Sequence, residues 1–377
     1  MSENDKPGYR EISEYYEHLI RTGELAAGAR LETEEKLARR YGVTRTTVRR
    51  AFAVLVRKGL VMKRQGRGTF VASAENVKRR MLSPVLIAPY RTVDVLPGDP
   101  STPMHPLRFR FGYLEAVVRA LGVYARPFQI CFIENDPVAL DGLAETVRAS
   151  RSVGIVAFDV DDAQTVDAMT SLGVPVVFVD AVTFGKPVNT VLAADREGSR
   201  EATRYLLRTT GGPLVFVGPP SAQWDTGPNR ERLEGFKEAH AEVGRDVSSD
   251  DIHVAEYIST SRGRSAAGWA LARTPRPRGI VCSTDFLAIG ILEELKKQHI
   301  SVPREVSVIG FGNDFPFVST EPTLSTVWVD RALMCQRGVE QLEACIQTPR
   351  TRPWTRHVPT RLLLRQSTIP TLSTGAF

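Results

Sequence analysis

Apolar residues recur every three or four positions near the start of the chain, which predicts three short amphipathic helices over about residues 9–22, 34–41 and 45–58. Thr33 and Thr44 stand at the starts of the second and third helices, where a hydroxyl caps unpaired backbone N–H groups. Two short alternating runs follow the third helix and predict a pair of strands. The pattern as a whole is typical of a helix-turn-helix followed by a β-hairpin wing.

From residue 84 onward the pattern changes to short, β-branched apolar runs separated by helical stretches. The runs lie at residues 84–88, 128–132, 153–158, 175–179, 214–218, 280–282 and 306–310. Buried apolar strands that alternate with helices predict parallel sheets built from βαβ units. There are too many strands for one sheet, so we expect an α/β fold with two lobes. We expect domain boundaries at 1–72 and 84–377, joined by a linker over 73–83.

Charge is distributed unevenly between these two modules. Residues 1–80 contain 18 Lys and Arg against 10 Asp and Glu, a net charge of +8. The rest of the chain holds 49 − 18 = 31 basic and 43 − 10 = 33 acidic residues, a net charge of −2. Between Lys36 and Ala74 there are eleven basic residues and no acidic one. Such a one-signed cluster predicts a polyanionic partner, and duplex DNA fits it best.

The candidate DNA contacts lie on the third helix and in the wing. Arg45, Thr46 and Arg49 share the face opposite the apolar positions, within the first two turns. In helix-turn-helix proteins these positions reach base edges in the major groove. Gly66 and Gly68 flank Arg67, so the backbone there can approach a phosphate or the minor groove closely.

The first module resembles the winged helix-turn-helix of the GntR family. The resemblance covers about residues 8–72 and includes Gly28-Ala29-Arg30-Leu31, Val43-Thr44-Arg45-Thr46-Thr47-Val48-Arg49 and Gly66-Arg67-Gly68-Thr69-Phe70-Val71. It implies DNA contacts from Arg45, Thr46, Thr47, Arg49, Gly66 and Arg67. The sequence departs from the family at Glu35, where an Arg is usual, and Lys36 could take over that contact.

Polar residues follow the predicted strands of the second module. They are Asp180, Gly218-Pro219, Ser283-Thr284-Asp285 and Gly310-Phe311-Gly312-Asn313-Asp314. Ligands of open α/β sheets bind beyond the carboxyl ends of the strands. Short polar side chains with nearby aromatic rings suit a polyhydroxylated ligand, because rings stack on the apolar faces of sugars while carboxylates and amides bind hydroxyls.

The second module resembles the effector domain of the LacI/GalR family. The matching segments are Arg232-Leu233-Glu234-Gly235-Phe236, residues 283–290, residues 302–311 and residues 321–327. The resemblance implies a periplasmic-binding-protein-like fold with three crossovers, a homodimer, and a small-molecule effector, a sugar or sugar derivative, between the lobes. It implies effector contacts from Asp180, Arg232, Thr284, Asn313 and Trp328.

Several of these residues have a purely structural alternative. Thr284 stands where family members commonly have Asn, and Gly312 where sugar-binding members often have Asp. Asp285 could cap a helix that starts at Phe286, Trp328 could belong to the core near a crossover, and Arg232 could be a surface ion-pair partner. The segment 91–106 is longer and richer in proline than the family pattern.

The favoured function is a ligand-responsive DNA-binding transcription regulator, a repressor of a carbohydrate catabolic operon. A solute-binding protein of a transport system is the alternative, although it has no use for a basic head. An enzyme is not expected, because the sequence has no nucleophile elbow or phosphate loop. No cofactor or metal is expected, since the six histidines and four cysteines lack ligand spacing. We find no signal peptide or membrane span and expect a cytoplasmic protein.

Overall fold

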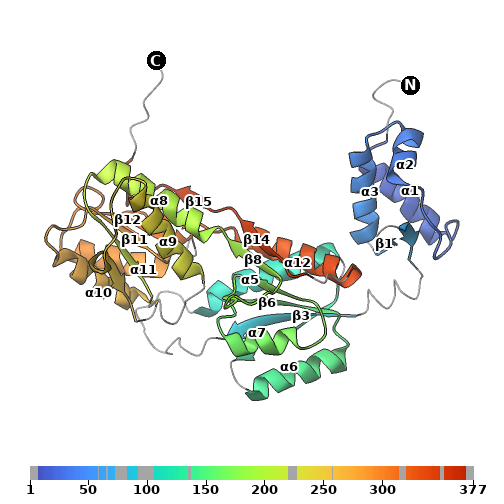
Figure 1. The fold of residues 1–377 in the computed structure, drawn as a ribbon, viewed down its shortest axis with the longest axis horizontal. Helices are drawn as coiled ribbons and strands as arrows, with labels where there is room; N and C mark the ends of the chain where they lie inside the picture. The colour runs from blue at the N-terminus through green and yellow to red at the C-terminus, as the bar shows by residue number, and fades with distance from the viewer. Residues whose placement is uncertain are drawn as a thin grey trace.

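A small helical module and two α/β lobes follow one another along the long axis of the molecule (Figure 1). This computed structural model describes residues 7–57, 59–64, 67–72, 83–91, 106–124, 126–134, 137–219, 227–256, 258–313, 320–348 and 352–370. The predicted fold class, a winged helix-turn-helix joined to a two-lobed α/β body, is confirmed.

The first module contains the three predicted helices and the two-stranded wing. Its elements are α1 (Tyr9–Arg21), α2 (Glu34–Tyr41), α3 (Arg45–Arg57), β1 (Val61–Arg64) and β2 (Gly68–Val71). The hydroxyl of Thr33 accepts a hydrogen bond from Lys36 N at 3.3 Å, and that of Thr44 accepts one from Thr47 N at 3.1 Å. Both predicted caps are therefore present.

The apolar faces of the three helices form one small core. Ile12, Leu37, Val48 and Leu55 are almost fully buried in it. The two wing strands pair antiparallel, with Val61 opposite Val71. The core fixes α3 relative to the wing.

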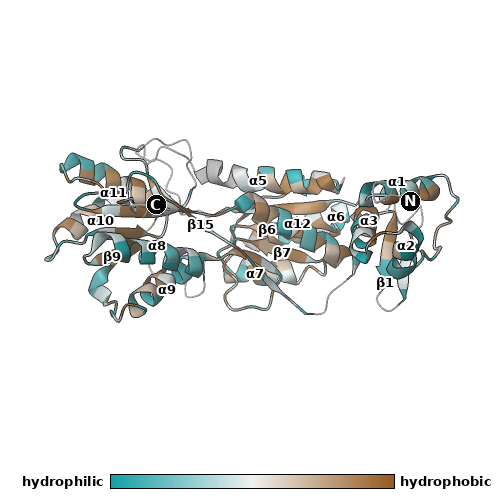
Figure 2. Ribbon diagram, turned by 90° about the horizontal axis from the view of Figure 1, so that it is seen from above, coloured by the Kyte–Doolittle hydropathy of each residue, from teal (hydrophilic) through white to brown (hydrophobic). Residues whose placement is uncertain are grey.

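The lobe next to the helical module, the N-lobe, is a parallel sheet covered by helices. The strand order is β14-β8-β7-β6-β3-β4, with β5 paired to β3. Its elements are β3 (Val85–Arg91), α5 (Pro106–Val123), β4 (Phe128–Ile130), β5 (Ile133–Glu134), α6 (Pro137–Ser150), β6 (Gly154–Phe158), α7 (Ala163–Thr170), β7 (Val176–Val179), β8 (Thr190–Ala193), α12 (Arg331–Gln347) and β14 (Thr355–Val358). In Figure 2 the central strands β6 and β7 are hydrophobic, as expected for strands buried on both faces.

The distal lobe, the C-lobe, repeats this architecture. Its strand order is β10-β9-β11-β12-β13-β15, and only β15 runs antiparallel to its neighbour. Its elements are α8 (Asp195–Thr210), β9 (Leu214–Gly218), α9 (Pro228–Ala241), the 3₁₀ helix η3 (Ser249–Asp251), β10 (Ile252–Val254), α10 (Thr260–Leu271), β11 (Gly279–Cys282), α11 (Asp285–Lys297), β12 (Ser307–Gly312), β13 (Ser325–Trp328) and β15 (Arg361–Leu363).

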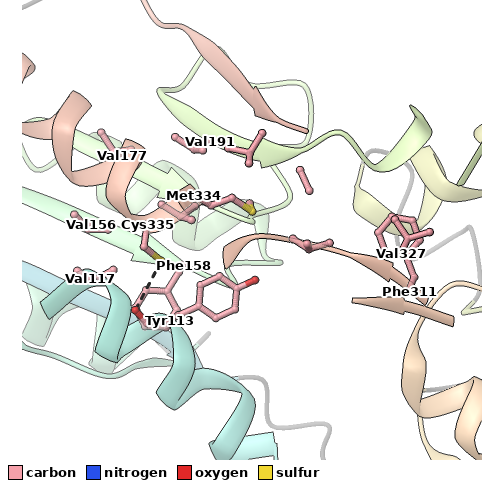
Figure 3. Close-up of a cluster of buried hydrophobic side chains, with 14 of the residues drawn as sticks. Tyr113, Val117, Val156, Phe158, Val177, Val191, Phe311, Val327, Met334 and Cys335 are labelled. Atoms are coloured by element: carbon pink, nitrogen blue, oxygen red, sulfur yellow. Dashed lines mark hydrogen bonds between the residues drawn. The ribbon is translucent and has the colours of Figure 1, made fainter. Parts of the chain in front are cut away.

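The chain crosses between the lobes three times, as the resemblance implied. It crosses from β8 to α8, from β13 to α12, and from β14 to β15. Helix α12 therefore returns to the N-lobe, where it packs on α5 and β7. Buried side chains continue across this junction: Tyr113 and Phe158 of the N-lobe belong to the same cluster as Phe311 and Val327 of the C-lobe (Figure 3).

Candidate functional sites

The predicted recognition residues lie on the exposed face of α3. Arg45, Thr46 and Arg49 are exposed, and Thr47 is half-buried with its hydroxyl 2.9 Å from that of Thr44. Arg67 is exposed at the turn of the wing. Gly66 lies outside the described residues. Three of the predicted contacts, Arg45, Thr46 and Arg49, thus share the exposed face of α3, and Arg67 lies at the turn of the adjacent hairpin.

A carboxylate that the charge pattern did not single out lies between the third helix and the wing. Arg49 Nε donates to Glu34 Oε2 at 3.2 Å, and Lys63 Nζ donates to Glu34 Oε1 at 2.8 Å. Burial alone would raise the pKa of Glu34, but the two cations outweigh it and the pKa is lowered. Its neighbour Glu35 instead pairs with Arg39 of the same helix at 2.7 Å.

At the carboxyl end of the N-lobe sheet, Asp180 follows β7 in a left-handed conformation, with φ of 51°. Its Oδ2 accepts a hydrogen bond from the hydroxyl of Tyr113, and its Oδ1 is buried without a hydrogen-bond partner among the described residues. Arg331 Nε donates to the same Tyr113 hydroxyl at 2.9 Å, and Arg331 Nη1 donates to Gly312 O of the C-lobe at 3.1 Å. These bonds connect the two lobes.

Burial, together with the Asp180 carboxylate, raises the pKa of Tyr113 well above its usual value. The phenol therefore stays protonated at neutral pH and remains a hydrogen-bond donor. An unpaired, buried carboxylate oxygen is costly unless it finds a donor. The Oδ1 atom of Asp180 is thus a buried acceptor for which the described residues supply no donor.

On the C-lobe side, Arg232 is buried and held from three directions. Its Nε donates to Asp195 Oδ1 at 2.7 Å, its Nη1 donates to Ser283 O at 2.6 Å, and its guanidinium carbon lies 4.0 Å from the centroid of the Phe311 ring. The interpretation of Arg232 as a surface ion-pair partner is wrong, because the pair is buried. Burial raises the pKa of Asp195, the Arg232 cation lowers it, and the charge of Asp180 raises it again. The result is a pKa of about 6.

Helix α11, which follows β11, begins at Asp285, whereas a cap at Asp285 would require the helix to begin at Phe286. Thr284, not Asp285, is the N-cap of α11, and its hydroxyl accepts from Leu287 N at 3.4 Å. The carboxylate of Asp285 instead accepts a hydrogen bond from the Thr326 hydroxyl at 2.6 Å, which fastens α11 to β13. The interpretation of Asp285 as the cap is therefore wrong.

Asn313 and Trp328 lie at the ends of two paired strands, since Gly312 is in register with Trp328. The side chain of Asn313 accepts a hydrogen bond from Arg365 Nη2 at 2.8 Å. Trp328 is half-buried beside the crossover to α12, with the Arg361 guanidinium carbon 5.0 Å from its ring centroid. Both positions are at the carboxyl end of the C-lobe sheet.

The structure brings Asp180 and Arg232 toward each other through Asp195, which interacts electrostatically with both. Asp195 also lines a cavity of about 630 Å³ between the N-lobe edge and the starts of α8 and α9; other lining residues are Ala181, Thr183, Leu192, Gly227, Arg230, Glu231 and His357. Sequence reasoning missed Tyr113, Asp195 and Arg331. For Asp195, the sequence signal was a polar residue that follows closely after the apolar strand β8.

Two negative findings concern the described part of the chain only. Among the residues placed by the structure, no group of three or more His, Cys, Asp or Glu side chains could hold a metal ion. Within the same ranges, no helix is both long and apolar enough to cross a membrane.

Comparison with known families finds a match within each module. Residues 8–71 match the model described as bacterial regulatory proteins, gntR family, and residues 213–368 match that of a periplasmic binding protein-like domain. The chain is a GntR-type DNA-binding domain fused to a LacI-type periplasmic-binding-protein-like domain. This fusion has the architecture that the sequence predicted.

Individual relatives agree with the fusion. The chain is 24% identical over 352 residues to an arabinose metabolism transcriptional repressor of Halalkalibacterium halodurans, and the match covers 91% of this chain and 90% of that protein. It is 26% identical to the repressor of the same name from Geobacillus stearothermophilus, covering 92% of each. The solved transcriptional regulator CelR–cellobiose complex shares the fold, with a TM-score of 0.63, 22% identity, and coverage of 89% of this chain and 100% of that one.

These relatives are DNA-binding transcription regulators and not enzymes, which confirms the expected class of function. The alternative of a solute-binding protein for transport is wrong for the same reason. The fusion carries a regulatory DNA-binding domain and a small-molecule-binding fold in one chain.

Proposed function

We propose that the protein is a repressor of a carbohydrate catabolic operon that binds operator DNA through residues 1–72 and releases it in response to a sugar. The observation that carries the proposal is the presence, in one chain, of a basic winged helix-turn-helix and a two-lobed α/β body. The arabinose repressors, which match over nine-tenths of the chain, support a sugar effector.

On the DNA side, Arg45 and Arg49 contact base edges in the major groove, assisted by Thr46 and Thr47. The exposed face of α3 supports this assignment. Gly66 and Arg67 contact the backbone or the minor groove at the wing. Lys and Arg contacts to phosphate supply most of the affinity and make it dependent on salt.

On the effector side, the sugar lies between the lobes. Asp180 accepts hydrogen bonds from its hydroxyls, and Arg232 donates to its oxygens from the opposite wall. Thr284, Asn313 and Trp328 complete the C-lobe side, with the indole as the stacking surface. The unpaired Oδ1 of Asp180 and the fixed guanidinium of Arg232 support this arrangement.

The working form is a cytoplasmic homodimer formed through residues 84–377, with 73–83 as the linker. One recognition helix covers too few base pairs for specific binding in a genome, so two heads read two half-sites. Sedimentation of the full chain at micromolar concentration tests the dimer, and a monomer would contradict it.

Regulation follows from the two-lobed fold. A sugar that binds one arrangement of the lobes more tightly than the other shifts the population toward it. That shift changes the spacing of the two heads and hence their fit to the operator.

The proposed effector is tested by a thermal-shift screen of the full chain. Monosaccharides, sugar acids and sugar phosphates are added one at a time, with L-arabinose among them. A true effector raises the melting temperature in a concentration-dependent way. It also releases an operator that the protein itself has selected from random DNA. Absence of a shift with every sugar class would contradict the proposal.

A further inference from the structure

We propose that Glu34 is a specificity-determining positioning residue, which ties Arg49 of α3 to Lys63 of the wing and thereby orients the Arg49 guanidinium toward the bases. The proposal rests on the DNA-binding function above and adds to it a residue of opposite charge. Glu34 itself makes no contact with DNA in this account.

The geometry links three elements through one carboxylate. Glu34 is the first residue of α2, and the Thr33 cap fixes the backbone immediately before it. Its two oxygens are shared between Arg49 at 3.2 Å and Lys63 at 2.8 Å, which belong to α3 and β1. Only 19% of the Glu34 side chain is exposed, against 62% for Arg49 and 48% for Lys63. The carboxylate therefore lies beneath the two cations.

Charge balance explains why a carboxylate is useful there. Arg30, Arg45 and Lys63 line the same hollow between α2, α3 and the wing, of about 440 Å³, together with Glu32, Glu34 and Glu35. Glu32 and Glu35 pair with Arg40 and Arg39, so Glu34 is the carboxylate that offsets the repulsion between Arg49 and Lys63. The lowered pKa of Glu34 agrees with a carboxylate that stays ionised beneath cations.

The bond to Arg49 engages Nε. A guanidinium carries further N–H donors on its two terminal nitrogens, in a fixed plane. Holding Nε on Glu34 restricts that plane and leaves N–H donors on the edges that do not face the carboxylate for a base. Bidentate recognition of a base requires such a restricted orientation. A good bidentate contact between a side chain and a base is worth about 1–3 kcal/mol of discrimination against a wrong base.

The carboxylate also has a cost, since it places a negative charge near the DNA phosphates. Removing it has two opposite consequences. Affinity for any DNA rises, because the module becomes more positive. Preference for the correct sequence falls, because Arg49 is no longer oriented. A purely structural role would instead weaken binding to all DNA together.

The adjacent Glu35 supplies a matched control. It has the same charge and lies on the same helix, but its side chain is 57% exposed and pairs with Arg39 one turn along α2. Glu35→Gln therefore removes the same charge from the module without removing the ion pairs to Arg49 and Lys63.

The experiment uses the full chain and two duplexes of equal length and composition. One is an operator that the wild type selects from random DNA, and the other is its scrambled sequence. Both Glu34→Gln and Glu35→Gln are expected to bind the scrambled duplex about two- to threefold more tightly than the wild type. The ratio of the two affinities is expected to fall about tenfold in Glu34→Gln and to stay unchanged in Glu35→Gln.

A second variant guards against loss of folding. Glu34→Asp keeps the charge but is one methylene shorter, so it is expected to lower the ratio without tightening binding to scrambled DNA. Equal ratios in wild type, Glu34→Gln and Glu34→Asp would overturn the inference. If the wild type itself selects no sequence, the proposed function fails instead, so the two failures are distinguishable.

Discussion

Arg232 and Asp195 form a buried ion pair at the junction of the lobes. Their Nε–Oδ1 distance is 2.7 Å, and only 10% and 3% of the two side chains are exposed. Ser283 O and the ring of Phe311 hold the same guanidinium in place. Arg232 is therefore fixed within the C-lobe structure, and in the proposed site the effector meets a guanidinium whose position is already set.

Replacing Arg232 by Lys is expected to weaken the response to the effector at least tenfold. Lysine keeps a positive charge for Asp195 but loses the planar fork, which can contact Asp195, Ser283 O and a ligand at once. DNA binding without effector is expected to stay intact, because the heads and the cleft are separate.

The check is effector titration of an operator complex. Arg204→Lys, on the exposed face of α8, serves as the control and is expected to respond as the wild type does. A wild-type response from Arg232→Lys would show that the assigned site is wrong.

Effector affinity is expected to fall as pH drops through about 6, the pKa of Asp195. Below that value Asp195 becomes neutral and its charge-assisted hold on Arg232 weakens, which is worth about tenfold in affinity. The free energy of unfolding changes in the opposite direction. Folding raises the pKa of Asp195 from about 4 to about 6, so the protein loses stability as pH rises through this range and Asp195 ionises.

Calorimetric titration of the effector between pH 5 and pH 8 measures this dependence. A flat affinity over the whole range would mean that Asp195 does not control Arg232.

The second buried ion pair makes a prediction about stability. Arg126 Nε and Nη2 each lie 2.7 Å from an oxygen of Glu343, with side-chain exposures of 8% and 4%. Glu343→Gln leaves a buried guanidinium without its counter-charge and is expected to cost about 3–5 kcal/mol in the free energy of unfolding.

The exposed pair of Arg119 and Glu115 on α5 is the control. Glu115→Gln is expected to change the free energy of unfolding by about 0.5 kcal/mol or less. Urea denaturation of both variants decides the matter, and equal small losses would contradict the assignment of a structural role to the Arg126–Glu343 pair.

Arg49→Ala is expected to cost about 1–3 kcal/mol of operator affinity and to relax base preference, and the double variant with Arg45→Ala to cost more. Arg21→Ala, on α1 and paired with Glu17, is the control. Fluorescence anisotropy at several salt concentrations measures both affinity and salt slope. Unchanged affinity in the double variant would refute the assignment.

Elements with a strong local signal could be predicted from the sequence. The caps at Thr33 and Thr44 and the apolar faces of α1 to α3 determine the helical module almost alone. The fully buried strands β6, β7, β9 and β12 appear as β-branched runs. Each of these signals is contained in a few consecutive residues.

Elements that depend on distant partners could not be predicted in this way. Strand β14 is polar and mostly exposed, and it is extended because it pairs with β8. The contacts of Arg331 with Tyr113 and of Arg232 with Asp195 join residues 218 and 37 positions apart. Glu34 lies just outside the acid-free stretch, so the charge count did not reveal that this carboxylate pairs with Arg49 and Lys63.

The central claim is that one chain couples a sugar to DNA binding, and anisotropy of a labelled, self-selected operator with and without the effector tests it most directly. The full-length wild type is expected to bind with two chains per operator and to lose at least tenfold in affinity when the sugar from the thermal-shift screen is added. Arg232→Lys is expected to bind equally well and to keep its affinity at the same sugar concentration. Operator affinity that is the same with and without sugar in the wild type would contradict the account.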